Sequence, residues 1–172
     1  AYEGLQYRYM APQVFTDQEF AYIQEHLRIL SGFYGILRPF DGVTPYRLEM
    51  GARLKTSFCK SLYDFWGDGL YRALTADGTD TLVNLASEEY AKAVRPWVSP
   101  PVRWIHVVFG ELNGEKLVEK GVYVKMARGE MVRCLAQQGA EEPEVMQSLS
   151  PLGYRFQRDR SDETTYVFCK EA

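Results

Sequence analysis

The fold is decided by one long strand candidate, Val102-Arg103-Trp104-Ile105-His106-Val107-Val108-Phe109-Gly110-Glu111-Leu112, and by the turn after it. Apolar side chains on both faces of this stretch are typical of a buried strand. Asn113-Gly114 is a preferred hairpin turn, so we expect 116–118 to return beside the strand. A helix of about 124–138 follows. The stretch therefore predicts a strand, a hairpin and a helix at the centre of the fold.

Helices and strands alternate on the amino-terminal and carboxy-terminal sides of this segment. Thr16 and Glu19 have the spacing of a capping box, which predicts a helix over 17–27. Residues 32–45 hold three glycines and two prolines, which predicts an ordered loop. The interleaving predicts the mixed α/β class. Apolar periodicity predicts further helices at 61–74, 88–94 and 142–148 and strands at 29–30, 81–85, 154–158 and 164–168.

Length and composition indicate one folded domain. The chain has 172 residues, 46% of them hydrophobic and 25% charged, and it holds no repeat or long linker. We expect 1–172 to form a single compact domain with a mixed central sheet flanked by helices. No apolar run approaches the roughly 20 residues that a membrane helix needs, so we expect a soluble cytoplasmic protein without a membrane partner. The first residue is alanine, and we expect the natural start to be missing.

Cysteine and histidine usage favours neither a disulfide scaffold nor a metal site. Cys59, Cys134 and Cys169 are isolated, which predicts reduced thiols buried as small apolar residues. His26 and His106 are the only histidines and lie 80 positions apart. A metal site would need carboxylate or cysteine ligands from elsewhere in the fold. The sequence therefore predicts no metal site and no cofactor.

Charge is unevenly distributed along the chain, although the net charge is −3. Residues 27–60 hold six Lys/Arg against two Asp/Glu, and residues 91–133 hold eight against four, so each segment carries a local +4. Such alternation is able to place a basic face on an acidic protein. It is equally compatible with ordinary solvated charges.

The helix predicted at 124–138 carries a first candidate site. On a helical wheel, Lys125, Arg128 and Arg133 lie opposite the core-facing residues, with Gly129 between them. Glycine inside a helix costs roughly 1 kcal/mol relative to alanine, so its presence needs a reason. One interpretation is a platform for an anion or a phosphate, lined by the three cations. The other is a solvated helix face with a glycine chosen for packing.

The loop around Arg38 and Arg47 is a second candidate. Prolines fix the backbone near both arginines, and a rigidly held guanidinium makes bidentate phosphate contacts at lower entropic cost. These arginines are therefore candidates for phosphate or base contacts. The alternative is that they pair with Asp41 and Glu49 and hold the loop in place.

Asn84, Ser87 and Glu89 form a third candidate, at the junction of a buried strand and a helix. Such junctions often carry ligand groups in α/β folds, and these three side chains are able to bind or to act as acid and base. An ordinary helix cap at Ser87 is the simpler interpretation. The chain contains no nucleophile elbow, phosphate-binding loop motif or dinucleotide fingerprint.

Five segments spread over nearly the whole chain carry a resemblance. They are Leu30-Ser31-Gly32-Phe33-Tyr34-Gly35-Ile36-Leu37-Arg38-Pro39, Pro45-Tyr46-Arg47-Leu48-Glu49-Met50, Leu62-Tyr63-Asp64-Phe65-Trp66-Gly67-Asp68, Asn84-Leu85-Ala86-Ser87-Glu88-Glu89-Tyr90 and Lys125-Met126-Ala127-Arg128-Gly129-Glu130-Met131-Val132-Arg133. In order and spacing these segments resemble the YaaA family. The resemblance implies a cytosolic bacterial protein that limits oxidative damage during hydrogen peroxide stress, with a role linked to intracellular iron.

The resemblance also implies a positively charged cleft that binds DNA, associated with a helix-hairpin-helix element. We expect binding mainly to backbone and shape, with little base readout. The cations that match motif positions are Arg38, Arg47, Lys92, Lys125, Arg128 and Arg133.

One departure from the family pattern is the lack of a Ser-Pro-Ala-Lys motif, which family members carry in an amino-terminal segment. We therefore expect this chain to hold only part of the cleft and to bind DNA more weakly than a full-length member. The alternative function is an enzyme that acts on a nucleobase, nucleoside or nucleotide at Asn84, Ser87 and Glu89. The sequence establishes neither a reaction nor an oligomeric state.

Overall fold

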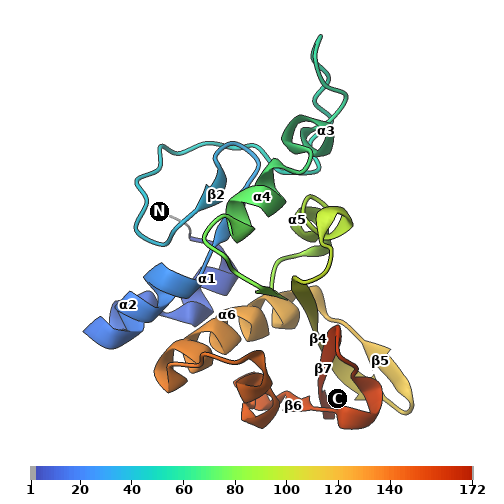
Figure 1. The fold of residues 1–172 in the computed structure, drawn as a ribbon. Helices are drawn as coiled ribbons and strands as arrows, with labels where there is room; N and C mark the ends of the chain where they lie inside the picture. Colours follow the sequence, from blue (N-terminus) through green and yellow to red (C-terminus); the bar gives the residue numbers. More distant parts are fainter. Residues whose placement is uncertain (1–2, 172) are drawn as a thin grey trace. The chain divides into compact units, whose positions relative to one another are not determined.

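The structure is a computed structural model that describes residues 3–171 (Figure 1). The chain packs as two compact units. The first comprises His26–Trp104, and the second comprises the described residues of Tyr2–Glu25 together with those of Ile105–Ala172. Helices and strands are interleaved in both, which confirms the mixed α/β class predicted from the sequence. The prediction that 1–172 is a single domain stays a prediction.

The first unit begins with a small antiparallel hairpin in which Ile29 pairs with Leu37 and Ser31 with Gly35. Its second strand lies inside the segment predicted to be only a loop. The elements of this unit are β1 (Ile29–Ser31), β2 (Gly35–Leu37), α3 (Leu62–Trp66), α4 (Gly69–Thr75), β3 (Thr81–Asn84), α5 (Glu88–Ala91) and the 3₁₀ turn η2 (Arg95–Trp97).

The core of the first unit is built from residues that are far apart in the sequence. Met50 and Val94 are completely buried, and partly buried side chains such as Trp66 pack against the same cluster. Burial of this apolar surface is the main force that holds short elements together. It also fixes the loop that precedes Met50 and the helix that precedes Val94.

The predicted helix over 61–74 is wrong in one respect, because it is broken into α3 and α4. Gly67 ends α3 with φ 47° and ψ −129°, a backbone conformation that side chains with a Cβ rarely adopt. Ser61 begins α3, and its hydroxyl accepts a hydrogen bond from the Asp64 backbone N–H at 3.2 Å. The two short helices therefore follow from a cap and a stop that lie six positions apart in the sequence.

The second unit contains the mixed sheet. Strand β4 (Arg103–Asn113), whose first two residues belong to the first unit, pairs in parallel with β7 (Thr165–Glu171) and antiparallel with β5 (Lys116–Val118). Strand β6 (Arg155–Phe156) pairs antiparallel with β7, and the two lie within or overlap the strands predicted at 154–158 and 164–168. The other elements are α1 (Leu5–Met10), η1 (Pro12–Val14), α2 (Asp17–His26), α6 (Gly121–Gln138), η3 (Pro143–Ser148), η4 (Pro151–Gly153) and η5 (Arg158–Arg160).

The capping box predicted for α2 is present. The Thr16 backbone N–H donates to the Glu19 carboxylate at 2.9 Å, and the Glu19 N–H donates to the Thr16 hydroxyl at 3.2 Å. Two N–H groups that a helix start leaves without intrahelical partners are thereby satisfied.

Helix α6 packs closely against α1, and Gly129 is the point of closest approach. A Cβ built on Gly129 would lie 1.9 Å from the Gln6 backbone oxygen and 2.9 Å from the Met10 nitrogen. Only a residue without a Cβ fits between the two helices. The glycine therefore serves the approach of another backbone rather than of a phosphate, which corrects the platform interpretation at this position.

A buried carboxylate links the sheet to its neighbours. Glu111, on β4, is 6% exposed and pairs with Lys120 and, at 3.7 Å, with Lys170. The hydrogen bond from Lys120 holds the pKa of the Glu111 carboxyl below its ordinary value. The Lys170 ammonium also lies 4.6 Å from the centre of the Tyr154 ring, so its charge contacts both a carboxylate and an aromatic face.

The three cysteines are free thiols, as predicted, and Cys59 and Cys169 are buried. Across residues 3–171, no three His, Cys, Asp or Glu side chains are grouped closely enough to hold a metal ion. Within the same residues, no helix is both long and apolar enough to cross a membrane.

Candidate phosphate-binding face

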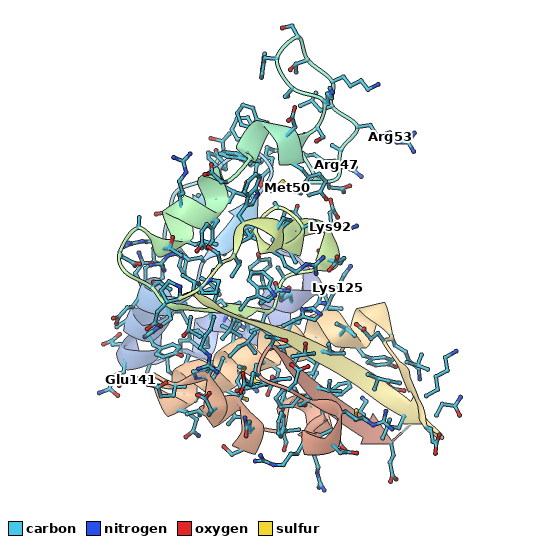
Figure 2. The ribbon with its side chains drawn as sticks, turned by 45° about the vertical axis from the view of Figure 1, so that its right-hand side comes forward. Arg47, Met50, Arg53, Lys92, Lys125 and Glu141 are labelled. Atoms are coloured by element: carbon cyan, nitrogen blue, oxygen red, sulfur yellow. The ribbon has the colours of Figure 1, made fainter. Side chains whose placement is uncertain are left out.

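Three cations of the first unit point to one side of it. Figure 2 shows the side chains of Arg47, Arg53 and Lys92 projecting in the same direction, from the loop around Met50 and from the end of α5. All three residues are exposed. We call this set the basic face. The resemblance to the YaaA family implied both Arg47 and Lys92 as candidate cations, and Figure 2 shows them on one side of the first unit.

Glu89 connects the loop of the basic face to helix α5. Its carboxylate accepts a hydrogen bond from the Gly51 backbone N–H at 2.8 Å, between segments 38 positions apart. Tyr63 strengthens the junction, because its hydroxyl donates to the Glu89 backbone oxygen at 2.8 Å. Completely buried Met50 anchors the loop on the core beside this contact. The spacing between Arg47, Arg53 and Lys92 is therefore set by packing and not by the loop alone.

The cations of the basic face differ from two other exposed cations of the unit, Arg72 and Arg95, in having no carboxylate partner. Arg95 pairs with Glu88 through two hydrogen bonds of 2.6 and 2.9 Å, and Arg72 pairs with Asp68 at 3.0 Å. Within residues 3–171, Arg47, Arg53 and Lys92 form no ion pair. Their charge is thus available to an external anion.

The predicted pairing of Arg38 and Arg47 with nearby carboxylates is not made. Asp41 accepts from the Arg38 backbone N–H at 2.7 Å and so closes a turn without using the guanidinium. Neither arginine side chain forms an ion pair with a described residue. Arg38 is exposed, as a phosphate contact would require.

The predicted cations of α6 have three different environments. Lys125 is exposed and carries no ion pair in the part of the chain that is described, whereas Arg133 is half-buried and pairs with Glu130. Arg128 is half-buried, and burial lowers the pKa of its guanidinium. The Nε atom of Arg128 is buried without a hydrogen-bond partner among the described residues. Lys125 and Arg128 therefore keep their charge free, and Arg133 does not.

Two of the three candidates for acid–base chemistry, Asn84 and Glu89, make hydrogen bonds that stabilise the local structure. Asn84 is buried, and its side-chain oxygen accepts from the Ala86 N–H at 3.1 Å. Ser87 occupies the cap position of α5, but its hydroxyl makes no cap hydrogen bond. Glu89 binds the Gly51 backbone. The contacts of Asn84 and Glu89 stabilise the strand-to-helix junction, whereas Ser87 contributes no side-chain hydrogen bond to the cap.

Sequence reasoning missed Arg53 and its neighbours Lys55 and Lys60. All three are exposed, and residues 50–60 contain no Asp or Glu. The sequence therefore contains a short cationic segment without acidic neighbours. Its charge is less evident over the longer segment 27–60, which also includes Asp41 and Glu49.

These features define a mixed α/β protein with a set of exposed, unpaired cations on one of its units. The chain belongs to the peroxide stress protein YaaA family, whose model matches residues 1–160.

Two relatives show the extent of the similarity. A UPF0246 protein of Desulfitobacterium hafniense is 55% identical over 170 residues, which cover 99% of this chain and 67% of that protein. A UPF0246 protein of Agathobacter rectalis is 49% identical over 168 residues, covering 98% of this chain and 67% of that protein.

Proposed function

We propose that this member of the peroxide stress protein family binds DNA in the bacterial cytoplasm through phosphate contacts made by the basic face. The observation that carries the proposal is the orientation of Arg47, Arg53 and Lys92 to one side without carboxylate partners. A duplex presents one phosphate charge per roughly 1.7 Å of its axis, so grouped cations gain affinity from counterion release. In peroxide stress, the protein would act on DNA and so limit damage linked to intracellular iron.

Phosphate contacts give binding without base readout, because phosphates carry no sequence information. The unpaired cations Arg38, Lys125 and Arg128 are further candidates for such contacts. Arg133 is a weaker candidate, since Glu130 already compensates its charge.

In this proposal, Glu89 positions the loop of the basic face and takes no part in a reaction. Its hydrogen bond to Gly51 fixes the loop that carries Arg47 and Arg53 against the helix that ends at Lys92. We expect Glu89→Ala to weaken DNA binding by loosening this junction. Glu89→Gln keeps an oxygen that accepts from Gly51, so it should retain binding, whereas an enzyme that uses this carboxylate would lose its activity.

The test is fluorescence anisotropy of a labelled duplex across a salt series. Each of Arg47→Ala, Arg53→Ala and Lys92→Ala should weaken binding and flatten the slope of log affinity against log salt by about 1. Arg72→Ala is the matched control, because Arg72 is exposed but paired with Asp68. Salt-independent binding, or equal losses in the control and the three variants, would reject the basic face as the DNA site.

A further inference from the structure

Residues 52–60 form an arm between the basic face and helix α3, and Figure 1 shows it extending beyond α3. The end of the arm is an ordered turn. Thr56 donates its backbone N–H to the Cys59 oxygen at 3.0 Å, and the Thr56 hydroxyl accepts from the Cys59 N–H at 3.0 Å. The buried side chain of Cys59 anchors the turn. The arm therefore has a defined conformation, which fixes the positions of its exposed side chains.

This turn exposes the aromatic ring of Phe58. Phe58 is 73% exposed, although burial of a phenylalanine ring would stabilise the fold. Its ring lies 6.3 Å from that of Phe65, which is 51% exposed. Phe65 in turn contacts Trp66 edge-to-face at 5.0 Å, and the Trp66 indole N–H donates to the Gly32 oxygen at 3.1 Å. Trp66, held by this hydrogen bond, therefore supports the exposed pair of Phe58 and Phe65.

The arm that carries Phe58 also carries three cations. Arg53, Lys55 and Lys60 are exposed, and none of them forms an ion pair with a described residue. Arg53 also belongs to the basic face, so the arm continues that surface. Exposed rings among unpaired cations match a ligand that offers both phosphates and flat apolar faces. Unpaired nucleotides have this chemistry, because their bases are free to stack while their phosphates contact the cations.

We propose that Phe58, supported by Phe65, stacks on unpaired bases and gives the protein a preference for DNA that contains single-stranded or distorted segments. The proposal rests on the DNA binding proposed for the basic face, since the arm adds base stacking to phosphate contacts. Stacking does not depend on base identity, so the preference is for structure and not for sequence.

The experiment compares three labelled DNAs by anisotropy: a full duplex, the same duplex with a central tract of unpaired bases, and that tract with abasic sites in place of its bases. The wild-type protein should bind the unpaired tract most tightly. Phe58→Ala should weaken that binding by about 10-fold and leave duplex binding unchanged. Phe58→Trp should retain the preference. Phe40→Ala is the control, because Phe40 is 59% exposed but lies outside the arm.

Several results would overturn the proposal. Equal, salt-dependent binding to duplex and unpaired DNA would reject the stacking and leave the basic face standing. Equal binding to the base-containing and abasic tracts would assign the preference to backbone flexibility. Absence of binding to all three DNAs would reject both proposals. If Phe58→Ala removed only self-association or binding to anionic vesicles, the aromatic pair would be a contact for a second copy or for a lipid surface. Circular dichroism of each variant checks that the fold is intact.

Discussion

Replacing Gly129 with alanine is expected to destabilise the second unit by separating two helices. The new Cβ would lie 1.9 Å from the Gln6 backbone oxygen, whereas ordinary van der Waals contact begins at 3.4 Å. Helix α1 would therefore have to move away from α6 by about 1.5 Å along that contact, since a backbone group cannot rotate aside as a side chain does.

The size of the effect follows from two opposing terms. Overpacking of this kind costs about 1–3 kcal/mol, and a clash with backbone belongs at the upper end. Alanine gains up to about 1 kcal/mol in helix propensity over glycine. The net loss should be about 2 kcal/mol, which lowers the melting temperature by about 4–8 °C in a protein of this size.

Equilibrium unfolding in urea measures this loss as a lower midpoint at unchanged slope. Gly121→Ala is the matched control, because it lies at the start of the same helix and its added Cβ meets nothing within 4 Å. That variant should be as stable as the wild type or slightly more stable. If Gly129→Ala behaved in the same way, the close packing of α1 on α6 would be wrong.

Two further predictions concern pH. Lys120 holds the pKa of the Glu111 carboxyl low in the folded protein. This ion pair should therefore contribute its full stability at pH values above about 4.3, the pKa of a glutamate in the unfolded chain. The contribution should be lost as the pH falls through the lower pKa of the folded protein. Glu111→Gln should be less stable than the wild type at neutral pH and lose less on acidification, as seen by thermal unfolding at stepped pH. Burial raises the pKa of Tyr22 to about 12, so stability should fall between pH 10 and 12 as the unfolded state ionises first. Tyr22→Phe should reduce that alkaline loss of stability, and an unchanged alkaline profile would contradict the prediction.

The candidate site was predictable residue by residue but not as an arrangement. Arg47 was identified from its proline-bearing loop, which is a local feature, and Lys92 was implied by the resemblance to the YaaA family. Their common orientation depends on the hydrogen bond from Gly51 to Glu89, which joins segments 38 positions apart. No pattern of neighbouring residues encodes such a contact.

The environments of individual cations on helix α6 were not predictable from the helical wheel. Lys125, Arg128 and Arg133 were grouped by the helical wheel, yet Arg133 pairs with Glu130 and Arg128 is half-buried. A wheel assumes that one face of a helix is solvated. Here a second helix packs beside Gly129, so part of the supposedly solvated face is interior.

By itself, the sequence determined the elements whose signals are local: the long strand at 103–113, the hairpin after it, the capped helix that begins at Asp17, and the family. The periodicity of hydrophobic residues, turn residues and helix caps act over a few positions, so they are recognisable from the sequence without the tertiary structure. The tertiary structure decided the rest. Helix α1 has six residues, too few to be stable alone, and forms because Gly129 lets it pack on α6. The basic face, likewise, exists only because distant segments share one core.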